Sequence, residues 1–456
     1  MPGSCDVFIC GAGIAGVSTA YQLSVKHGIK NIYLVDERPP LTLTSDSSTE
    51  CYRNWWPGPG SAMVALMNRS IDLLEELAVI SGDVFHLNRR GYLYLTGNAE
   101  KIPSFIDAAR QISELGGGPL RFHYGTNSGS LYEPSAAEGW ENQPVGADLL
   151  LDPSLIQNHF PYVGETTVAA LHVRRAGWFS AQQLGMYLLE QARLHGVKLV
   201  QARVTGVEVT SGKIASVRLD NNETIFTDTF INASGPFQQD VAALLGIDLP
   251  VFAEFHQKVA FRDTLAVLDR DAPLLIWTDP QYLDWSPEEA SMLAEEPEFR
   301  WLLDLLPSGV HTRPEGGSAS STMLMLWEYH TEQLVPTWPL PFDPQYPEIV
   351  LRGMMTMLPG LRNYIGRLPK PVLDGGYYLK TRENRPIIGP MGINGAYIMG
   401  GLSGFGIMAA CGASELLAAH ITGSHLPSYS QDFSLDRYQD PNYLKKIESF
   451  ESSGQL

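Results

Sequence analysis

The sequence predicts an α/β protein of two domains, and three observations support this fold. An apolar strand pattern at 6–10 (DVFIC) runs into a helical pattern, and a second apolar strand follows at 32–35. Similar strand patterns recur in the middle and near the end of the chain, at 226–233 and 396–399. A chain of 456 residues is also too long for one compact domain. We therefore expect one domain built from discontinuous segments, and a second domain formed by the two segments inserted between them.

The other elements follow from periodicity and from turn-forming residues. Helical spacing of apolar residues predicts helices at 61–80 and 180–195, one in the acidic stretch 286–306, and a last one ending near His420. Alternation predicts strands at 84–96, 200–209, 214–219, 323–329 and 377–381. Gly, Pro and Ser predict loops at 116–147 and 311–321.

The first strand, turn, helix and second strand form a complete βαβ unit. Gly11, Gly13 and Gly16 give the spacing GxGxxG, and Asp36 ends the second strand. Glycines at this spacing allow a tight turn, approach of a pyrophosphate to the backbone, and close packing of helix on strand. The acidic residue accepts hydrogen bonds from ribose hydroxyls. The pattern predicts a Rossmann-type domain that binds a dinucleotide.

A second glycine-rich turn favours FAD over NAD as this dinucleotide. The strand at 396–399 leads into Gly400, Gly401, Gly404 and Gly406 and then directly into a helix. Such a turn presents backbone N–H groups and a helix N-terminus, which suit the flavin C2 carbonyl when the reduced ring becomes anionic. The chain has only one GxGxxG fingerprint, whereas an NAD-linked flavoenzyme usually carries two.

Composition excludes several other classes of function. The net charge of −18 disfavours binding to nucleic acid. Neither a CxxC pair nor a histidine at metal-ligand spacing accompanies Cys5, Cys10, Cys51 and Cys411, so we predict no metal site. Neither a signal peptide nor an apolar run of about 18 residues is present. We expect a cytoplasmic protein without a membrane span.

Four blocks of sequence resemble the D-amino-acid oxidase superfamily, and within it the sarcosine and dimethylglycine oxidoreductase-like branch. They are GAGIAG at 11–16 with Asp36, SSTECYR at 47–53, INASGP at 231–236, and NRPIIG at 384–389 followed by GGLSGFG at 400–406. The resemblance covers nearly the whole chain. It implies an FAD-binding domain of 1–80, 178–250 and 376–440, and a substrate domain of 81–177 and 251–375 with a large mixed β-sheet. It also implies oxidation of a C–N bond by hydride transfer to flavin N5.

The motifs and the resemblance together predict which residues contact FAD. Ser48 and Arg53 are expected beside the flavin ring and the pyrophosphate, and the 231–236 block behind the adenosine half. The predicted cofactor residues are Gly11, Gly13, Ile14, Ala15, Gly16, Asp36, Glu37, Ser48, Arg53, Val204, Ala233, Gly235, Pro386, Gly401, Ser403, Gly404, Phe405 and Gly406.

Departures from the family pattern bear on attachment and on substrate. The segment 377–384 lacks the cysteine, and the loop at 47–53 lacks the histidine, through which relatives hold FAD covalently, so we predict non-covalent FAD. Met408 and Tyr378 stand where a lysine of sarcosine oxidases and an arginine of glycine oxidases grip the substrate carboxylate. The oxygen-activating lysine of sarcosine oxidases would fall in 323–330, which contains no lysine.

The predicted catalytic residues are therefore a new set. Candidates for a substrate carboxylate are Arg53 and Arg382, and candidates for the pocket wall are Tyr378, Trp327 and Tyr329. Amine deprotonation is supported either by Tyr329 or His330, or by a site that lowers the pKa of the substrate itself. Lys258 is expected to be a strand-surface lysine. The leading hypothesis is oxidation of a small amine or amino acid, including a secondary or N-methylated one, with oxygen or another carrier as acceptor. The alternatives are a flavoprotein accessory factor that acts on a partner protein, and an NAD(P)H-dependent monooxygenase.

Overall fold

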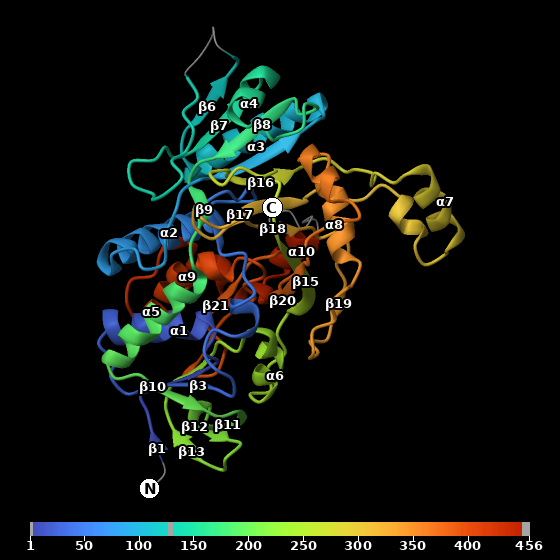
Figure 1. Cartoon of the computed structure of the whole chain (residues 1–456). Coiled ribbons are helices and arrows are strands. Elements are labelled where there is room, and N and C mark those ends of the chain that lie inside the picture. Colours follow the sequence, from blue (N-terminus) through green and yellow to red (C-terminus); the bar gives the residue numbers. More distant parts are fainter. Residues whose placement is uncertain (1–2, 126–130, 449–456) are drawn as a thin grey trace.

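Two large β-sheets organise the structure, a computed structural model that describes residues 3–125 and 131–448 (Figure 1). The first sheet has six strands in the order β10-β3-β2-β14-β22-β21. Five are parallel, and only β21 is antiparallel to its neighbour. Their bounds are β2 Val7–Cys10, β3 Ile32–Asp36, β10 Lys198–Gln201, β14 Phe230–Asn232, β21 Ile387–Pro390 and β22 Ala396–Gly400.

Both faces of this sheet are covered, which explains the unbroken apolar runs of β2 and β14. One face packs against α1 (Ile14–Tyr21), α5 (Ala181–Leu194) and α9 (Gly406–Thr422), with α2 (Ala62–Ser81) beside α9. A small four-stranded sheet covers the other face. Its strands are β1 Gly3–Ser4, β11 Val204–Thr210, β12 Lys213–Leu219 and β13 Thr224–Phe226.

The second sheet has ten strands and extends from the top of the molecule in Figure 1 down to the level of β21. Its strands are β5 Tyr92–Thr96, β6 Leu120–His123, β7 Ala147–Leu150, β8 Ala169–Val173, β15 Phe252–Arg262, β16 Leu274–Trp277, β17 His311–Glu315, β18 Thr322–Leu326, β19 Gln333–Leu334 and β20 Val372–Lys380. Alternate residues of β5 enter two separate hydrophobic cores, one on each face of the sheet. The predicted large mixed sheet is confirmed.

The remaining elements cover or connect the two sheets. β4 (Cys51–Arg53) pairs with β9 (Ala176–Trp178) between the sheets, and α8 (Tyr346–Met354) packs on the core of the ten-stranded sheet. The other helices are α3 Ile102–Ile112, α4 Pro153–His159, α6 Gln238–Ala243, α7 Pro287–Glu295 and α10 Pro441–Glu448. In Figure 1, α7 projects sideways from the body. Within the described residues, every helix is too short or too polar to cross a membrane.

The strands of the six-stranded sheet come from the three segments assigned to the FAD-binding domain, and most strands of the ten-stranded sheet come from the other two. β20 is the exception, because it begins at Val372 and runs across the predicted boundary at 375–376. The exact domain boundaries stay a prediction.

Several predicted elements are confirmed, and others are wrong. The helices at 61–80 and 180–195 are present. The predicted strands at 200–209 and 214–219 are present as a hairpin of β11 and β12, but the first is interrupted between β10 and β11. The predicted loop at 311–321 instead begins with β17, because pairing with β16 and β18 overrides the local signal of Pro314. The predicted strand at 226–233 is broken, since Thr227 Oγ1 accepts the N–H of Thr229 in a turn. The predicted loop 116–147 contains β6, and its part at 126–130 lies outside the described residues.

Candidate active site

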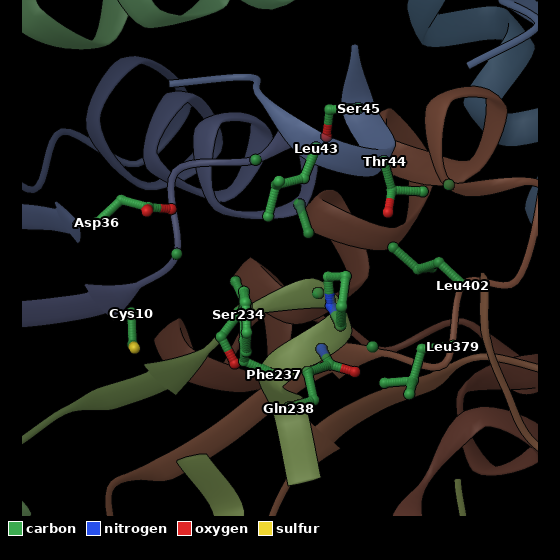
Figure 2. A pocket seen from close by; sticks show the side chains of 18 of the residues that line it. Cys10, Asp36, Leu43, Thr44, Ser45, Ser234, Phe237, Gln238, Leu379 and Leu402 are labelled. Carbon is green, nitrogen blue, oxygen red and sulfur yellow. The ribbon is translucent and has the colours of Figure 1, made fainter. Parts of the chain in front are cut away.

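A cavity of about 470 Å³ lies at the carboxyl ends of β2, β3, β14 and β22. Open parallel sheets bind their ligands at this edge. Figure 2 shows Asp36 at one end of the cavity and Leu379 and Leu402 at the other, with Leu43 and Thr44 on the opposite side from the residues of 234–238. The cavity is elongated, and its two ends are formed by the two glycine-rich turns.

The turn after β2 forms the first end. Gly11 has a φ of +108°, and a Cβ at this position would lie 2.4 Å from the carbonyl oxygen of Ala233. Only glycine therefore allows the turn to close against β14. At the start of α1, the N–H of Ile14 donates to Ser45 Oγ at 3.0 Å. This contact ties the 43–45 segment to the helix N-terminus, where a phosphate is favoured.

Asp36 holds the same turn in place and also lines the cavity. Its Oδ2 accepts the N–H of Ala12 at 2.8 Å, and its Oδ1 accepts the N–H of Arg38 at 2.9 Å. A carboxylate offers about four lone-pair sites, so two remain for a ligand hydroxyl. The predicted role of Asp36 at a ribose is consistent with this geometry.

An aromatic group that the sequence did not predict lies at this end. Phe237 and Arg38 both line the cavity. The Phe237 ring stacks on Trp338 with centroids 5.0 Å apart, and the Arg38 guanidinium lies 5.1 Å from the Phe237 centroid. Trp338 comes from the segment after β19, so this stack joins the two halves of the molecule. Its members are about 100 or more residues apart in sequence, and no local motif connects them.

The turn between β22 and α9 forms the other end. Ser403 has a φ of +47°, and its N–H donates to the carbonyl of Leu379 on β20 at 2.9 Å. A Cβ on Gly404 would come within 2.5 Å of the Tyr378 ring, so glycine is needed for the ring to lie there. Ser403 Oγ is buried and has no hydrogen-bond partner among the described residues. This unsatisfied group, together with the N-terminus of α9, fits a polar ring bound against the turn.

One face of β15 turns toward this end and carries three ionisable side chains. Glu254, His256 and Lys258 alternate along the strand and are all buried. Lys258 Nζ donates to the carbonyl of Ser48 at 2.8 Å and lies 2.9 Å from Asp374 Oδ2. The prediction of a strand-surface lysine is therefore wrong. The period-two spacing was a visible signal, because charged residues at alternate positions share one face of a strand.

Buried charges form a network around His256. His256 Nε2 lies 3.1 Å from Glu254 Oε2, and His256 Nδ1 lies 2.9 Å from Glu328 Oε1. Lys380 Nζ donates to Glu254 Oε2 at 2.9 Å. The imidazole also stacks on Tyr378, with ring centroids 4.0 Å apart and planes 16° apart. Burial alone would lower the pKa of His256, but Glu328 and Glu254 outweigh it and raise this pKa to about 9.

Comparison with models of protein families identifies the family to which this chain belongs. A family model described as FAD dependent oxidoreductase (DAO) matches residues 6–420. The chain belongs to the DAO family of FAD-dependent oxidoreductases. FAD is thus its cofactor, and the predicted family resemblance is confirmed. Among curated proteins, no sequence matches the chain.

Solved structures with the same fold match over nearly the full length. L-proline dehydrogenase from P. horikoshii has a TM-score of 0.72 at 20% identity, covering 96% of this chain and 99% of that one. Glycine oxidase from Bacillus cereus has a TM-score of 0.69 at 15% identity, covering 95% and 98%. Iminodiacetate oxidase from Chelativorans sp. has a TM-score of 0.68 at 18% identity, covering 94% and 98%. These similarities show a shared fold.

Most of the residues predicted to contact FAD line the cavity. Those that line it are Gly11, Gly13, Ile14, Ala15, Asp36, Glu37, Ser48, Val204, Ala233, Gly235, Gly401, Ser403, Gly404 and Gly406. Residues that line it without having been predicted include Arg38, Thr44, Ser45, Phe237 and Gln238. Among these, Gln238 helps to hold the second glycine-rich turn in place, because its Oε1 accepts the N–H of Gly401 at 3.1 Å. Direct contact of each residue with FAD stays a prediction.

Four predicted cofactor residues do not line the cavity. Gly16 lies under the turn, where a Cβ would be 1.8 Å from the Gly11 carbonyl oxygen. Arg53 is buried, with its guanidinium 4.6 Å from the Trp56 ring centroid, and Phe405 packs edge-on against the same tryptophan. Pro386 is buried, and its carbonyl accepts a hydrogen bond from Arg437. The structure places these side chains behind the cavity wall.

Only one of the predicted catalytic residues lines the cavity, namely Tyr378. Tyr329 stacks on Trp301 with ring centroids 5.7 Å apart, and His330 packs against the same tryptophan while its side chain remains exposed. Arg382 follows β20 on a turn and is exposed. The structure does not bring these three side chains to the cavity described above, and their catalytic roles stay predictions.

The charge network predicts a specific pH dependence of stability. A histidine whose pKa is raised by folding contributes stability that is complete below its unfolded pKa, about 6.5, and is lost as the pH rises through its folded pKa. The folded pKa of His256 is about 9. We expect the free energy of unfolding of the FAD-loaded protein, relative to a His256→Gln variant, to fall by on the order of 3 kcal/mol between pH 6.5 and 9.

Urea unfolding of both proteins across this pH range measures the difference. A His195→Gln variant is the control, because His195 is exposed at the end of α5. The control should follow the wild-type protein at every pH. If the free energy of unfolding changed with pH in the same way for the wild-type protein and for His256→Gln, the assigned charge network would be contradicted.

A buried arginine of the ten-stranded sheet fixes the loop before β4. Arg313 on β17 is fully buried, and its guanidinium donates to the carbonyl of Thr49 at 2.8 Å. It also lies 3.4 Å from Glu50 and 2.6 Å from Glu315. The guanidinium lies 5.2 Å from the Trp178 ring centroid. The loop that includes Ser48 at the cavity is therefore held by a residue more than 250 positions later.

Proposed function

We propose that this chain oxidises a C–N bond of a small amine or amino acid, including a secondary or N-methylated one. The observation that carries the proposal is the course of the cavity, which runs from the nucleotide turn to Tyr378, the ring that stacks on His256 of β15. The names of the structural neighbours, L-proline dehydrogenase, glycine oxidase and iminodiacetate oxidase, also support it, because each substrate contains a C–N bond.

Bound FAD would supply the acceptor for a hydride from the substrate carbon. In the overall reaction a C–H bond breaks, its electron pair leaves with the hydrogen, and the nitrogen lone pair forms a C=N bond. Water then hydrolyses the imine to a carbonyl compound and an amine, and oxygen or another carrier takes the two electrons. Burial raises the pKa of Tyr378, so this side chain serves as a neutral wall beside the reacting atoms.

Anaerobic mixing tests this function. We expect the flavin absorbance near roughly 450 nm to bleach on mixing with at least one member of a panel of amino acids and N-methyl amines, since only the panel supplies electrons. Admission of air then separates an oxidase from a dehydrogenase by the rate of recovery. Bleaching by dithionite but by none of the panel would reject the proposal.

Non-covalent attachment of FAD has its own test. Cys51 and Cys411 are buried and are not among the residues that line the cavity, and Cys10 lines it at the nucleotide end. Burial raises the pKa of Cys10 to about 12, so this thiol stays protonated and unreactive. We expect acid precipitation to release free FAD into the supernatant. Flavin that stays with the precipitated protein would contradict this expectation.

An accessory role on a partner protein is the second candidate, favoured by α7. This helix has no buried residues, and it projects from the body in Figure 1. The exposed fractions of Met292 and Tyr282 are 69% and 66%. Inertness toward every free amine, together with co-purification of one specific protein that is lost when residues 287–295 are replaced, would favour this function over the first.

A further inference from the structure

Cationic side chains near the flavin end of the cavity are already engaged by carboxylates. Lys258 lies 2.9 Å from Asp374, and Lys380 lies 2.9 Å from Glu254. Arg313 contacts both Glu50 and Glu315. A cation that is already paired with a carboxylate in the resting protein attracts a substrate carboxylate less strongly. This end of the cavity is therefore poorly suited to binding an anion.

Glu328 is also paired, with His256, but one of its two oxygens remains available. It lies two residues after the end of β18. In the antiparallel pair of β15 and β18, Val259 lies opposite Met325. Three residues further along each strand, the same register places Glu328 opposite His256. Its Oε1 contacts His256 Nδ1 at 2.9 Å. Among the described residues, its Oε2 accepts no hydrogen bond, and it is not one of the buried unsatisfied atoms.

The carboxylate of Glu328 remains partly accessible. Protein atoms surround Glu328 closely enough that burial is the largest influence on its pKa, although His256, His311 and Lys380 lower that pKa overall. Nevertheless 28% of its side-chain surface is accessible. Glu328 also interacts electrostatically with Tyr378, which lines the cavity. The accessible carboxylate thus lies next to the residue that ends the flavin side of the cavity.

A carboxylate at this place has a chemical consequence for the substrate. An ammonium group bound to Glu328 is kept in its charged form, because an opposite charge within about 4–6 Å favours ionisation. A nitrogen that loses hydride from its neighbouring carbon must instead carry a free lone pair. The nitrogen held by Glu328 and the nitrogen of the oxidised C–N bond are therefore different atoms.

We propose that Glu328 binds a cationic group of the substrate, and that the substrate class is an amine with a second, positively charged nitrogen remote from the oxidised C–N bond. Glu328 then determines specificity, since it anchors the charged end while the neutral nitrogen lies toward the flavin. This inference rests on the proposed amine oxidation and specifies its substrate class. His256 positions Glu328 through the hydrogen bond to its other oxygen.

A series of equal chain length tests the substrate class. The FAD-loaded protein is mixed anaerobically with 1,4-diaminobutane, 4-aminobutanoate and n-butylamine, which differ only at the end remote from one nitrogen. We expect the diamine to reduce the flavin with an apparent Kd at least about tenfold below those of the other two, the effect of one charge-assisted contact. Preference for 4-aminobutanoate, or equal affinity for all three, would overturn the proposal.

Glu328→Gln tests the residue. We expect it to raise the apparent Kd for the diamine by at least about tenfold, with little change in the limiting rate of flavin reduction. Glu332→Gln is the matched control, because Glu332 is exposed four positions further on. If Glu328→Gln does not hold FAD, the Glu328→Asp variant is used in its place. Aspartate keeps the charge on a shorter side chain, so we expect it to weaken binding of the diamine measurably but less than tenfold. Unchanged affinity in the variant that holds FAD would overturn the assignment.

A binding readout separates this inference from the proposed function. Butyltrimethylammonium has no nitrogen lone pair and cannot be oxidised by this route, and butanoate is its anionic counterpart. Titration of each into the oxidised FAD-loaded protein, followed by the flavin spectrum, should show saturable binding of the cation that is weakened in the Glu328 variant. Cation binding that depends on Glu328 without reduction by any amine would reject only the amine oxidation. Absence of cation binding, or tighter binding of butanoate, would reject the cation site.

Discussion

Replacement of Gly11 by alanine is expected to abolish FAD binding. The added Cβ would lie 2.4 Å from the Ala233 carbonyl oxygen and 2.8 Å from the Ser234 Cα, both of which belong to the backbone and cannot rotate away. The φ of +108° also disfavours any residue with a Cβ. Relief of both problems moves the turn that carries Gly13 and the start of α1, so the phosphate-binding groups leave their positions.

The FAD content of the purified Gly11→Ala variant, measured from the ratio of flavin to protein absorbance, checks this expectation. Gly28→Ala is a matched control, because Gly28 has a φ of +73° but no atom within 4 Å of the added Cβ. The control should lose only about 1–2 kcal/mol of stability, the usual cost of a left-handed conformation, and should retain its FAD. A fully loaded Gly11→Ala protein would show that the turn can adjust.

Replacement of Arg313 by methionine is expected to lower the free energy of unfolding by about 3–5 kcal/mol. The substitution leaves Glu315 without its closest partner, removes the counter-charge of Glu50 and leaves the carbonyl of Thr49 without two hydrogen bonds. Removal of one member of a buried ion pair is costly because the remaining charge stays desolvated. Urea unfolding of the FAD-loaded protein measures the loss.

Arg110→Met provides the comparison for this variant. Arg110 also pairs with a carboxylate, Asp107 at 3.8 Å, but its side chain is 62% exposed. An exposed pair contributes only about 0–1 kcal/mol, so the control should remain close to the wild-type protein. If both arginine variants lost the same small amount, the loop at 49–50 would not depend on Arg313.

The part of the site built by local turns could be predicted from the sequence. Gly11 and Gly404 stand in short motifs in which a strand, a glycine turn and a helix follow one another directly, so a single stretch of sequence contains the whole signal. The FAD fold and both ends of the cavity follow from these motifs. The helices α2 and α5 could be predicted equally well from the sequence, because their apolar residues are regularly spaced over several turns.

The charged face beside Tyr378 could not be found in the same way. His256 and Glu328 are 72 residues apart, and they meet only because β15 and β18 pair in one particular register. Pairing between distant strands depends on side-chain packing over the whole sheet, which local patterns do not contain. The same reason explains the error at Lys258, whose partners Ser48 and Asp374 lie on two other segments.

The interleaved order of strands has a consequence for synthesis of the protein. In the six-stranded sheet β14 is flanked by β2, the first strand of this sheet to be synthesised, and by β22, the last one. Until residues near 400 emerge, the nascent chain carries an open edge on an apolar central strand, an edge that attracts other chains. The wall at 401–407 is also missing until then. The FAD site is therefore complete only after residues 401–407 have been made, and a chain truncated before β22 exposes an edge of β14 that β22 covers in the complete fold.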